Sequence, residues 1–506
     1  MTLNKQHGNF LGLKDVMIID DVRLHKAIKA AALGNIIEWF DFSIYGFVAY
    51  ALGRAFLPES EPGMQRIAVL ATFAVPFLIR PLGGWFFGVL GDRYGRQKIL
   101  SLTIIIMSLS TACISIIPSY HSIGIWAPIC LVLCKIIQGF SIGGEYIGAS
   151  IFVAEYSPDR KRGFMGSWLD FSSIAGFVLG AGLVVLAAFI TGPDDFLKWG
   201  WRMLFLMALP LGVIGLYLRR GIGETPVFQQ HIAHLQQRGG YALSSGTRVS
   251  HYTMSFKEVF TTYRKSILTC MGLVITTNVT YYMLLTYMPS YLSYNLHYSE
   301  DDGIRITIAI MVCMLLLQPI MGLMSDRFGR RPLVITGSSM LLLLAIPCFM
   351  LINSSMIGLM FCGLLTLSLI LNSFTGVMAS ILPALFPTRI RYSALAASFN
   401  MSVLIASFTP TITAWLVEVT NNLYIPAYYL MIVGGIGLGT GVMMRETANL
   451  PLRGASPVAS DLEEAKELLI EHHAYIERKI TAIKKQIILL EKKRSHLINQ
   501  HPYIQE

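Results

Sequence analysis

Two carboxylates lie three residues apart in the apolar, aromatic stretch NIIEWFDFSIYGF, which spans residues 35–47. Glu38 and Asp41 are near the middle of an apolar run, from about Ala27 to Ala51, that is long enough to cross a bilayer. A charge at the bilayer centre costs at least about 2.5–3.5 kcal/mol on insertion scales. The spacing puts both acids on one helix face, and a carboxyl group that is buried beside another acid binds its proton more tightly. We therefore expect at least one of them to exchange protons near neutral pH; the alternative is a permanently paired structural ion.

Further ionisable residues fall inside other apolar segments. Lys135 is expected to face a cavity, where it pairs with a carboxylate or binds an anionic group of a substrate. A packing ion pair between helices is the alternative. Arg80, just before Pro81, is a similar candidate for substrate binding. Glu145 and Asp170 are candidates for proton coupling. Because Glu145 follows two glycines near the end of its segment, a role in a cytoplasmic gate is an equal alternative for it.

The composition places these residues inside a membrane. The chain has 506 residues, of which 54% are hydrophobic and 14% charged, and its mean hydropathy is +0.57. An ordinary soluble domain has about 25% charged residues. Twelve apolar segments begin near Ala27, Gln65, Ile99, Ser122, Gly163, Trp199, Ser266, Ile304, Pro332, Met356, Tyr392 and Pro426. The sequence therefore predicts an all-α membrane protein with twelve transmembrane helices.

Basic residues gather in alternate loops between these segments. They are Arg93, Arg96, Lys98, Arg160, Lys161, Arg162, Arg327, Arg330 and Arg331, whereas the loops SYHSIG, NSS and VTNNLY contain no Lys or Arg. By the positive-inside tendency, both termini are expected in the cytoplasm. The net charge of +10 lies largely in these loops, so we expect contact with anionic lipid to be possible and no nucleic-acid partner.

One loop sequence occurs twice. GVLGDRYGRQK, from Gly88, reappears as GLMSDRFGRR, from Gly322, and each copy follows the second span of a six-span half. Two parallel six-helix repeats around a central cavity are a known transporter plan. The predicted units are an N-terminal segment 1–25, a bundle 26–220, a central loop 221–265, a bundle 266–446, a linker 447–459 and a tail 460–506. The residues expected to form a gating latch are Gly88, Asp92, Arg93, Arg96, Gly322, Asp326, Arg327 and Arg330; charges that only set topology are the alternative.

The sequence gives no indication of an enzyme. The seven cysteines all lie in apolar segments without metal-ligand spacing. The glycine-rich stretch of the fifth span follows no strand, and no Walker lysine occurs. We expect no metal, no cofactor and no catalytic site.

The tail differs from the rest of the chain because it is highly charged and has helical periodicity. Steps of three and four residues select a seam that includes Leu469, Ile476, Ile480, Ile483, Ile487, Leu490, Arg494 and Leu497. Ser460 and Glu463 match a capping box at its start. The polar interruptions of the seam indicate a reversible coiled-coil homodimer. A single amphipathic helix on the cytoplasmic face or on anionic lipid is the alternative.

The repeated loop motif, G-x-x-x-D-R-x-G-R-[RK], resembles that of the major facilitator superfamily over residues from about 25 to 445; the first copy departs from it with Gln97 before Lys98. The stretches EWFDF, PLGG, QGFSIGGEY, AEYSPDRKRGFMGS and FPTRIRYSALA narrow the resemblance to metabolite:proton symporters. The resemblance implies the major facilitator fold in a bacterial inner membrane. It also implies that zwitterionic solutes, such as proline and glycine betaine, are imported together with protons. The resemblance implies that high osmolality activates this import. It further implies a latch that holds cytoplasmic helices together in the outward-open state, and it favours Asp41 as the proton carrier.

Such a cargo suggests which aromatic residues bind it. A quaternary ammonium has no N–H to donate, so ring faces must hold it by cation–π attraction. The candidates, for which ordinary packing is the alternative, are Trp39, Phe40, Tyr45, Tyr281, Tyr282 and Tyr287, with Asn278 and Asn400 as polar contacts.

Two other functions stay open at this point. The first is proton symport of organic acids, which should need a net positive pocket. The second is an osmosensor that signals through its tail, although no kinase, receiver or nucleotide-binding motif is present.

Overall fold

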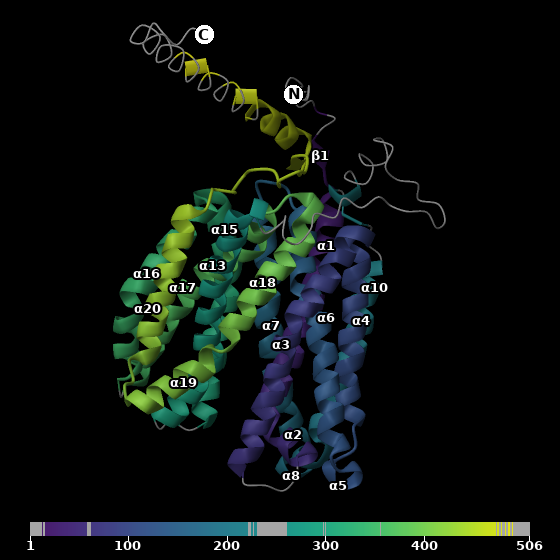
Figure 1. Cartoon of the computed structure of the whole chain (residues 1–506), viewed down its shortest axis with the longest axis vertical. Helices are drawn as coiled ribbons and strands as arrows, with labels where there is room; N and C mark the ends of the chain where they lie inside the picture. Colours follow the sequence, from purple (N-terminus) through teal and green to yellow (C-terminus); the bar gives the residue numbers. More distant parts are fainter. Residues whose placement is uncertain are drawn as a thin grey trace, which may run out of the picture.

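The structure is a computed structural model of the whole chain. It describes residues 16–57, 62–220, 261–296, 300–354 and 356–471, and short pieces at 13, 224–225, 227–229, 298, 473–474, 477, 481, 484–485 and 488. Nearly all described residues are helical, and the helices form two halves that lie side by side (Figure 1).

The first half contains six membrane-spanning segments. Five are single helices, and the sixth begins with the π-helical turn η2 and continues through α9 and α10. Its elements are α1 (Asp21–Phe47), α2 (Ala49–Phe56), α3 (Pro62–Tyr94), α4 (Arg96–Ile116), α5 (Tyr120–Ile123), α6 (Trp126–Tyr156), α7 (Arg162–Thr191), α8 (Pro193–Asp195), η2 (Phe196–Gly200), α9 (Trp201–Leu206) and α10 (Ala208–Arg220).

The second half repeats this plan. Its elements are α13 (Arg264–Tyr281), η3 (Tyr282–Tyr287), α14 (Met288–Ser290), η4 (Tyr291–Asn295), α15 (Glu300–Phe328), α16 (Arg330–Ile352), α17 (Ile357–Ala384), η5 (Thr388–Ile390), α18 (Arg391–Ser407), α19 (Thr409–Thr420) and α20 (Ile425–Met443). The π-helical segment η3 interrupts the first helix of this half, and such interruptions often occur at functional sites.

Ten segments in the described part of the chain are long and apolar enough to cross a membrane. They correspond to the third to twelfth predicted spans. The helices α1 and α3, with 27 and 33 residues, also have the length of a span. The predicted all-α membrane fold with twelve spans is confirmed.

The two halves contact each other through a few helices. α3 packs against α18, and α7 packs against α15 and α17, while α6 touches both α17 and α18. Pairs within each half, such as α1 with α7 and α16 with α20, complete the two bundles. This arrangement leaves α1, α3, α6 and α7 of the first half facing α13, α17 and α18 of the second.

A short parallel sheet, which the sequence did not predict, joins the segment before α1 to the segment after α20. β1 (Met17–Ile18) pairs with β2 (Val458–Ala459), with Met17 opposite Val458. Figure 1 shows β1 beyond the end of α1, on one side of the helices, and its pairing places β2 on the same side. We call this side the terminal face and the other side the opposite face.

The segment that leads to β2 crosses the terminal face and contacts both halves. Leu452, only 2% exposed, packs with Ala154 of α6 and Ala384 of α17. The guanidinium of Arg162 in the first half donates to the Leu450 carbonyl at 2.9 Å. The Arg453 carbonyl accepts from the backbone N–H of Thr388, in the second half, at 3.1 Å. We call residues 450–459 the strap, because they connect the two halves on one face.

Truncation of Leu452 should loosen the strap. A buried Leu→Ala change costs about 2–5 kcal/mol, and the lower value corresponds to an equilibrium shift of about 30-fold. Leu452→Ala should therefore speed hydrogen exchange at the Thr388 amide, as measured by mass spectrometry. Leu450→Ala is the matched control, because the Leu450 side chain is 50% exposed and only its carbonyl holds the strap. Equal exchange in the two variants would contradict the role of Leu452.

The tail starts as a helix at residues 462–471 and leaves the terminal face (Figure 1). Asp461 caps it by accepting from the backbone N–H of Glu464 at 2.8 Å, so the predicted capping box of Ser460 and Glu463 is wrong by one residue. Arg160 binds Glu467 and Glu471 at 2.5 and 2.8 Å. Leu469, a predicted seam residue, is partly buried against the small cluster that contains Val16 and Ala459. The other predicted seam residues, Ile476, Ile480, Ile483, Ile487, Leu490, Arg494 and Leu497, lie outside the described residues.

Candidate functional site

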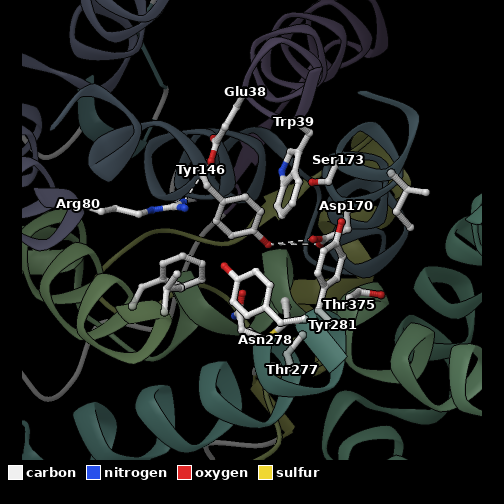
Figure 2. A pocket seen from close by; sticks show the side chains of 15 residues that line it. Glu38, Trp39, Arg80, Tyr146, Asp170, Ser173, Thr277, Asn278, Tyr281 and Thr375 are labelled. Atoms are coloured by element: carbon white, nitrogen blue, oxygen red, sulfur yellow. Dashed lines mark hydrogen bonds and ion pairs between the residues drawn. The ribbon is translucent and has the colours of Figure 1, made fainter. Parts of the chain in front are cut away.

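A cavity lies between the two halves, at the level where α1, α3, α6 and α7 face α13, α17 and α18 (Figure 2). Its lining is a mixture of charged, aromatic and small polar side chains. The lining residues are Glu38, Trp39, Arg80, Tyr146, Asp170, Ser173, Ile174, Thr277, Asn278, Tyr281, Tyr282, Thr375, Met378, Phe399 and Val403.

The single cation of the described lining is Arg80 of α3. Its Nη2 lies 3.2 Å from Glu38 Oε1, and its Nε donates to Asn400 Oδ1 at 3.0 Å. Asn400 is held in turn, since its Nδ2 donates to the carbonyls of Gly143 and Ala396, each at 2.8 Å. The guanidinium is therefore fixed in position by residues from both halves.

The second acid of the lining is Asp170 of α7. Tyr146 Oη donates to its two carboxylate oxygens at 3.1 and 3.3 Å (Figure 2). Tyr146 stacks on Phe399 of the other half, with ring centroids 5.1 Å apart. In the described part of the chain, Asp170 forms no ion pair.

Aromatic rings form another wall of the cavity. Trp39 lies against Tyr281, with centroids 5.1 Å apart, and Tyr281 is edge-on to Tyr282 at 6.1 Å. Phe77, which is not a lining residue, supports this wall from behind, edge-on to Tyr282 at 6.0 Å. These rings come from both halves, so a ligand between them would contact both.

Three buried polar atoms of the lining lack a partner among the described residues. They are Glu38 Oε2, Trp39 Nε1 and Tyr281 Oη. A buried polar group without a hydrogen bond costs about 1–3 kcal/mol, so these atoms indicate a place where water, a proton or a polar ligand binds.

A second polar cluster lies inside the first half, between α1, α4 and α6. Lys135 Nζ is 3.4 Å from Asp41 Oδ2 and 3.9 Å from the ring centre of Tyr45. Gln138 donates to Asp41 Oδ1 at 3.0 Å and to Thr111 at 2.7 Å. This ion pair is outside the cavity lining.

The structure divides the predicted site residues into two groups. Glu38, Asp170, Arg80, Trp39, Tyr281, Tyr282 and Asn278 line the cavity, whereas Asp41, Glu145, Lys135, Phe40 and Tyr45 do not. Phe40 and Tyr45 belong to the apolar core of the first half, and Glu145 accepts a hydrogen bond from Thr103 of α4. The sequence did not single out Tyr146, Ser173, Thr277, Thr375 or Phe399, because aromatic and small polar residues in spans serve mostly for packing.

The first motif copy ends at the boundary between the halves. Asp92, in the last turn of α3, accepts from the backbone N–H groups of Tyr392 and Ser393, at 3.2 and 2.9 Å, at the start of α18. A carboxylate is favourable there because a helix N-terminus has unpaired N–H groups and partial positive charge. Gly88 permits this contact, since a Cβ there would lie 2.9 Å from the Ser393 Cα.

The second copy makes the same contact in the reverse direction. Asp326 of α15 accepts from the backbone N–H groups of Gly163 and Phe164, at 2.7 and 2.8 Å, at the start of α7. Gly322 lies against Ser167, because a Cβ at position 322 would come within 2.5 Å of the Ser167 hydroxyl oxygen. Each half thus caps a helix of the other, and we call the two contacts the latches.

The arginines of the motif have two different environments. Arg96 and Arg330 are buried, and Arg96 lies 3.5 Å from both Asp92 and Glu155. Arg93 and Arg327 are exposed and lie over the neighbouring Tyr94 and Phe328 rings instead. Only the buried arginines, Arg96 and Arg330, support the latches directly. The glycine before each buried arginine has φ of +106° or +96°, a conformation that favours glycine.

The end of each half contains a capping acid that the sequence analysis missed. Glu224 accepts from the first two backbone N–H groups of α4, at 3.0 and 3.3 Å, and Glu446 from the first two of α16, at 3.1 and 3.0 Å. Burial raises the pKa of Glu224. Burial also opposes ionisation of Glu446, but backbone hydrogen bonds outweigh it and lower the pKa. The signal was the dipeptide E-T, which occurs at 224–225 and again at 446–447.

Among the described residues, no group of His, Cys, Asp and Glu side chains could hold a metal ion. All seven cysteines are free.

Comparison with known proteins gives two family matches. Residues 27–458 match the sugar (and other) transporter family, and residues 460–505 match the osmosensory transporter coiled coil. The second match confirms the predicted coiled-coil tail. The proline/betaine transporter of Escherichia coli strain K12 is 67% identical over 98% of both chains. The glycine betaine/proline/ectoine/pipecolic acid transporter OusA of Dickeya dadantii is 66% identical over 100% of both.

A solved structure shows the same fold. The major facilitator superfamily proton:xylose symporter XylE, bound to 6-bromo-6-deoxy-D-glucose, superposes with a TM-score of 0.70 over 89% of this chain and 100% of that chain, at 18% identity. The predicted major facilitator fold is confirmed.

Proposed function

The chain belongs to the sugar (and other) transporter family of the major facilitator superfamily, and we propose on this basis that it imports zwitterionic osmolytes together with protons. Membership of a transporter family makes it a carrier and not an enzyme. The names of the two bacterial relatives, at 67 and 66% identity, support proline and glycine betaine as substrates.

The charges of the cavity lining carry this proposal. Its described charged residues are Glu38, Asp170 and Arg80. With all three ionised the lining has one net negative charge, and one bound proton makes it neutral. Because an uncompensated charge is costly to bury, the cavity closes most easily around one proton and one neutral zwitterion. An organic acid with two or three negative charges would leave the closed cavity strongly negative, so the lining disfavours that alternative.

Glu38 is the proton carrier that the geometry supports best. One of its carboxylate oxygens contacts Arg80, and the other has no partner among the described residues. Asp41, paired with Lys135, and Glu145 lie behind it in the first half, and we assign them a supporting role in proton movement. Protonation of Glu38 would weaken its ion pair with Arg80 and free the guanidinium.

Transport would proceed by rocking of the two bundles, 26–220 and 266–446, around the cavity. We place the terminal face in the cytoplasm of a bacterium, because the basic loops lie there, and the chain in the inner membrane. The latches of Asp92 and Asp326 then close the cytoplasmic side. Their release would open the cavity to the cytoplasm.

The tail would adjust this equilibrium to osmolality. Its match to the osmosensory coiled coil supports homodimerisation through the predicted seam, with anionic lipid as a further partner of the basic terminal face. The strap and the ion pairs of Arg160 with Glu467 and Glu471 give the tail a direct connection to both halves.

Uptake by the purified protein in liposomes tests the proposal. Labelled glycine betaine, proline and citrate are offered with a pH gradient, acidic outside, at low and high external osmolality. We expect accumulation of the first two, abolished by a protonophore and increased at high osmolality. Glycerol, which crosses the bilayer, is the osmolality control and should not activate. Uptake of citrate alone would contradict the substrate class, and uptake indifferent to the gradient would contradict proton coupling.

A further inference from the structure

We infer that the zwitterion binds in one orientation, with its carboxylate on Arg80 and its cationic nitrogen against Asp170, so that Asp170 is a substrate-binding residue. This inference rests on the proposed function and assigns the two charged poles of the same cavity.

Arg80 has the properties of a carboxylate-binding pole. It is 6% exposed, and Asn400 fixes its Nε at 3.0 Å while its Nη2 faces Glu38. A guanidinium offers several N–H donors in a planar fork that matches a carboxylate. Trp39 Nε1, which has no acceptor among the described residues, is a further donor on the cavity wall.

Asp170 has the properties of a cation-binding pole. Only Tyr146 donates a side-chain hydrogen bond to it, and in the described part of the chain no cation neutralises it. The acid is 8% exposed, so a negative charge on it would be largely buried and would need a cation of the ligand to compensate it. The rings of Tyr146, Trp39 and Tyr281 lie around the same space and can contact a quaternary ammonium by their faces.

Aromatic rings separate the two poles. The Arg80 guanidinium lies 5.9 Å from the centre of the Phe399 ring, Phe399 stacks on Tyr146, and the Tyr146 hydroxyl reaches Asp170. Figure 2 shows Arg80 and Asp170 on opposite sides of Tyr146. The opposite charges cannot neutralise each other through direct contact. A small molecule with a positive and a negative end can satisfy both, whereas an ion of one sign satisfies only one.

The same arrangement connects substrate binding to the proton. Glu38 and the substrate carboxylate would both bind Arg80. Once Glu38 is protonated it no longer competes as an anion, so carboxylate binding and proton binding favour each other.

Ligand selectivity in two variants tests the orientation. Labelled glycine betaine is competed with choline, which has the cation without the carboxylate, and with 3,3-dimethylbutyrate, in which carbon replaces the charged nitrogen. Arg80→Gln should weaken glycine betaine by about 10- to 100-fold, the range for a hydrogen bond to a charged group, and shift the preference toward choline. Asp170→Asn should weaken glycine betaine similarly and shift the preference toward 3,3-dimethylbutyrate.

Several controls make the result decisive. The double variant Glu38→Gln/Arg80→Gln removes the acid that Arg80→Gln leaves unpaired, and it should show the same shift toward choline. Arg202→Gln alters a guanidinium that binds the carbonyls of Ser115 and Ile117 outside the cavity, and it should keep the wild-type order of ligands.

The outcomes separate the two proposals. Absence of glycine betaine binding to the wild type would refute the proposed function. If the wild type binds glycine betaine but the two variants do not shift in opposite directions, the orientation alone is overturned. The same holds if neither analogue competes with glycine betaine on any of the proteins.

Discussion

Replacing Glu38 with glutamine should abolish proton-driven accumulation of the solute while leaving exchange across the membrane intact. Glutamine has the shape of the protonated acid but neither binds nor releases a proton. The cavity with Glu38→Gln can therefore close and reopen around the solute without a proton, and the pH gradient no longer drives net uptake. With one proton coupled to each solute, a gradient of one pH unit can support about a tenfold higher solute concentration inside than outside. In Glu38→Gln this concentration ratio should fall to one.

Reconstituted protein allows both activities to be measured on the same preparation. Gradient-driven uptake and counterflow of labelled glycine betaine are compared for the wild type, Glu38→Gln and Asp41→Asn. The family resemblance favoured Asp41 as the carrier, but its pair with Lys135 lies outside the lining, so Asp41→Asn should retain part of its coupling. Normal accumulation by Glu38→Gln, together with its complete loss in Asp41→Asn, would reject Glu38 and restore Asp41.

Removal of both latch carboxylates should open the terminal face. An N-cap side chain contributes about 1 kcal/mol, so Asp92→Ala and Asp326→Ala together should shift the equilibrium away from the closed state by about 30-fold. Each single variant should give roughly the square root of this effect, because the two latches lie on different helix pairs.

Distances between spin labels measure this opening directly. Lys161 and Arg327 are exposed on opposite halves, and labels there, in a cysteine-free background, should move apart in the double alanine variant. The Asp→Asn changes at the same two positions keep an oxygen acceptor and should open less. Asp195→Ala removes an exposed acid that pairs with Lys198 and should leave the distances unchanged. An unaltered distance distribution in the double alanine variant would refute the latch.

Local patterns in the sequence were sufficient for the architecture. A bilayer demands apolar runs of a certain length, and each of the twelve runs is visible without knowledge of its neighbours. The repeated motif around Asp92 and Asp326 indicated the two halves in the same local way, because each copy follows the second span of a six-span half. The charge of the intervening loops favoured a cytoplasmic side for them, and this orientation stays a prediction.

Contacts between distant segments could not be inferred in this way. Met17 pairs with Val458, and two-residue strands leave no periodic pattern. Tyr146 and Phe399 become site residues only because α6 and α18, from different halves, stack their rings together.

The two acids that first suggested proton transport illustrate the difference best. The sequence by itself determined that Glu38 and Asp41 share a membrane-spanning helix and must be neutralised or paired. Three residues along a helix still separate them by about 60° in direction and about 4.5 Å in height. Packing of α3 and α6 against α1 decided that Glu38 meets Arg80 at the cavity and Asp41 meets Lys135 behind it. The facing helices, not the spacing, supplied the partners, since a side chain's environment depends on what packs against it.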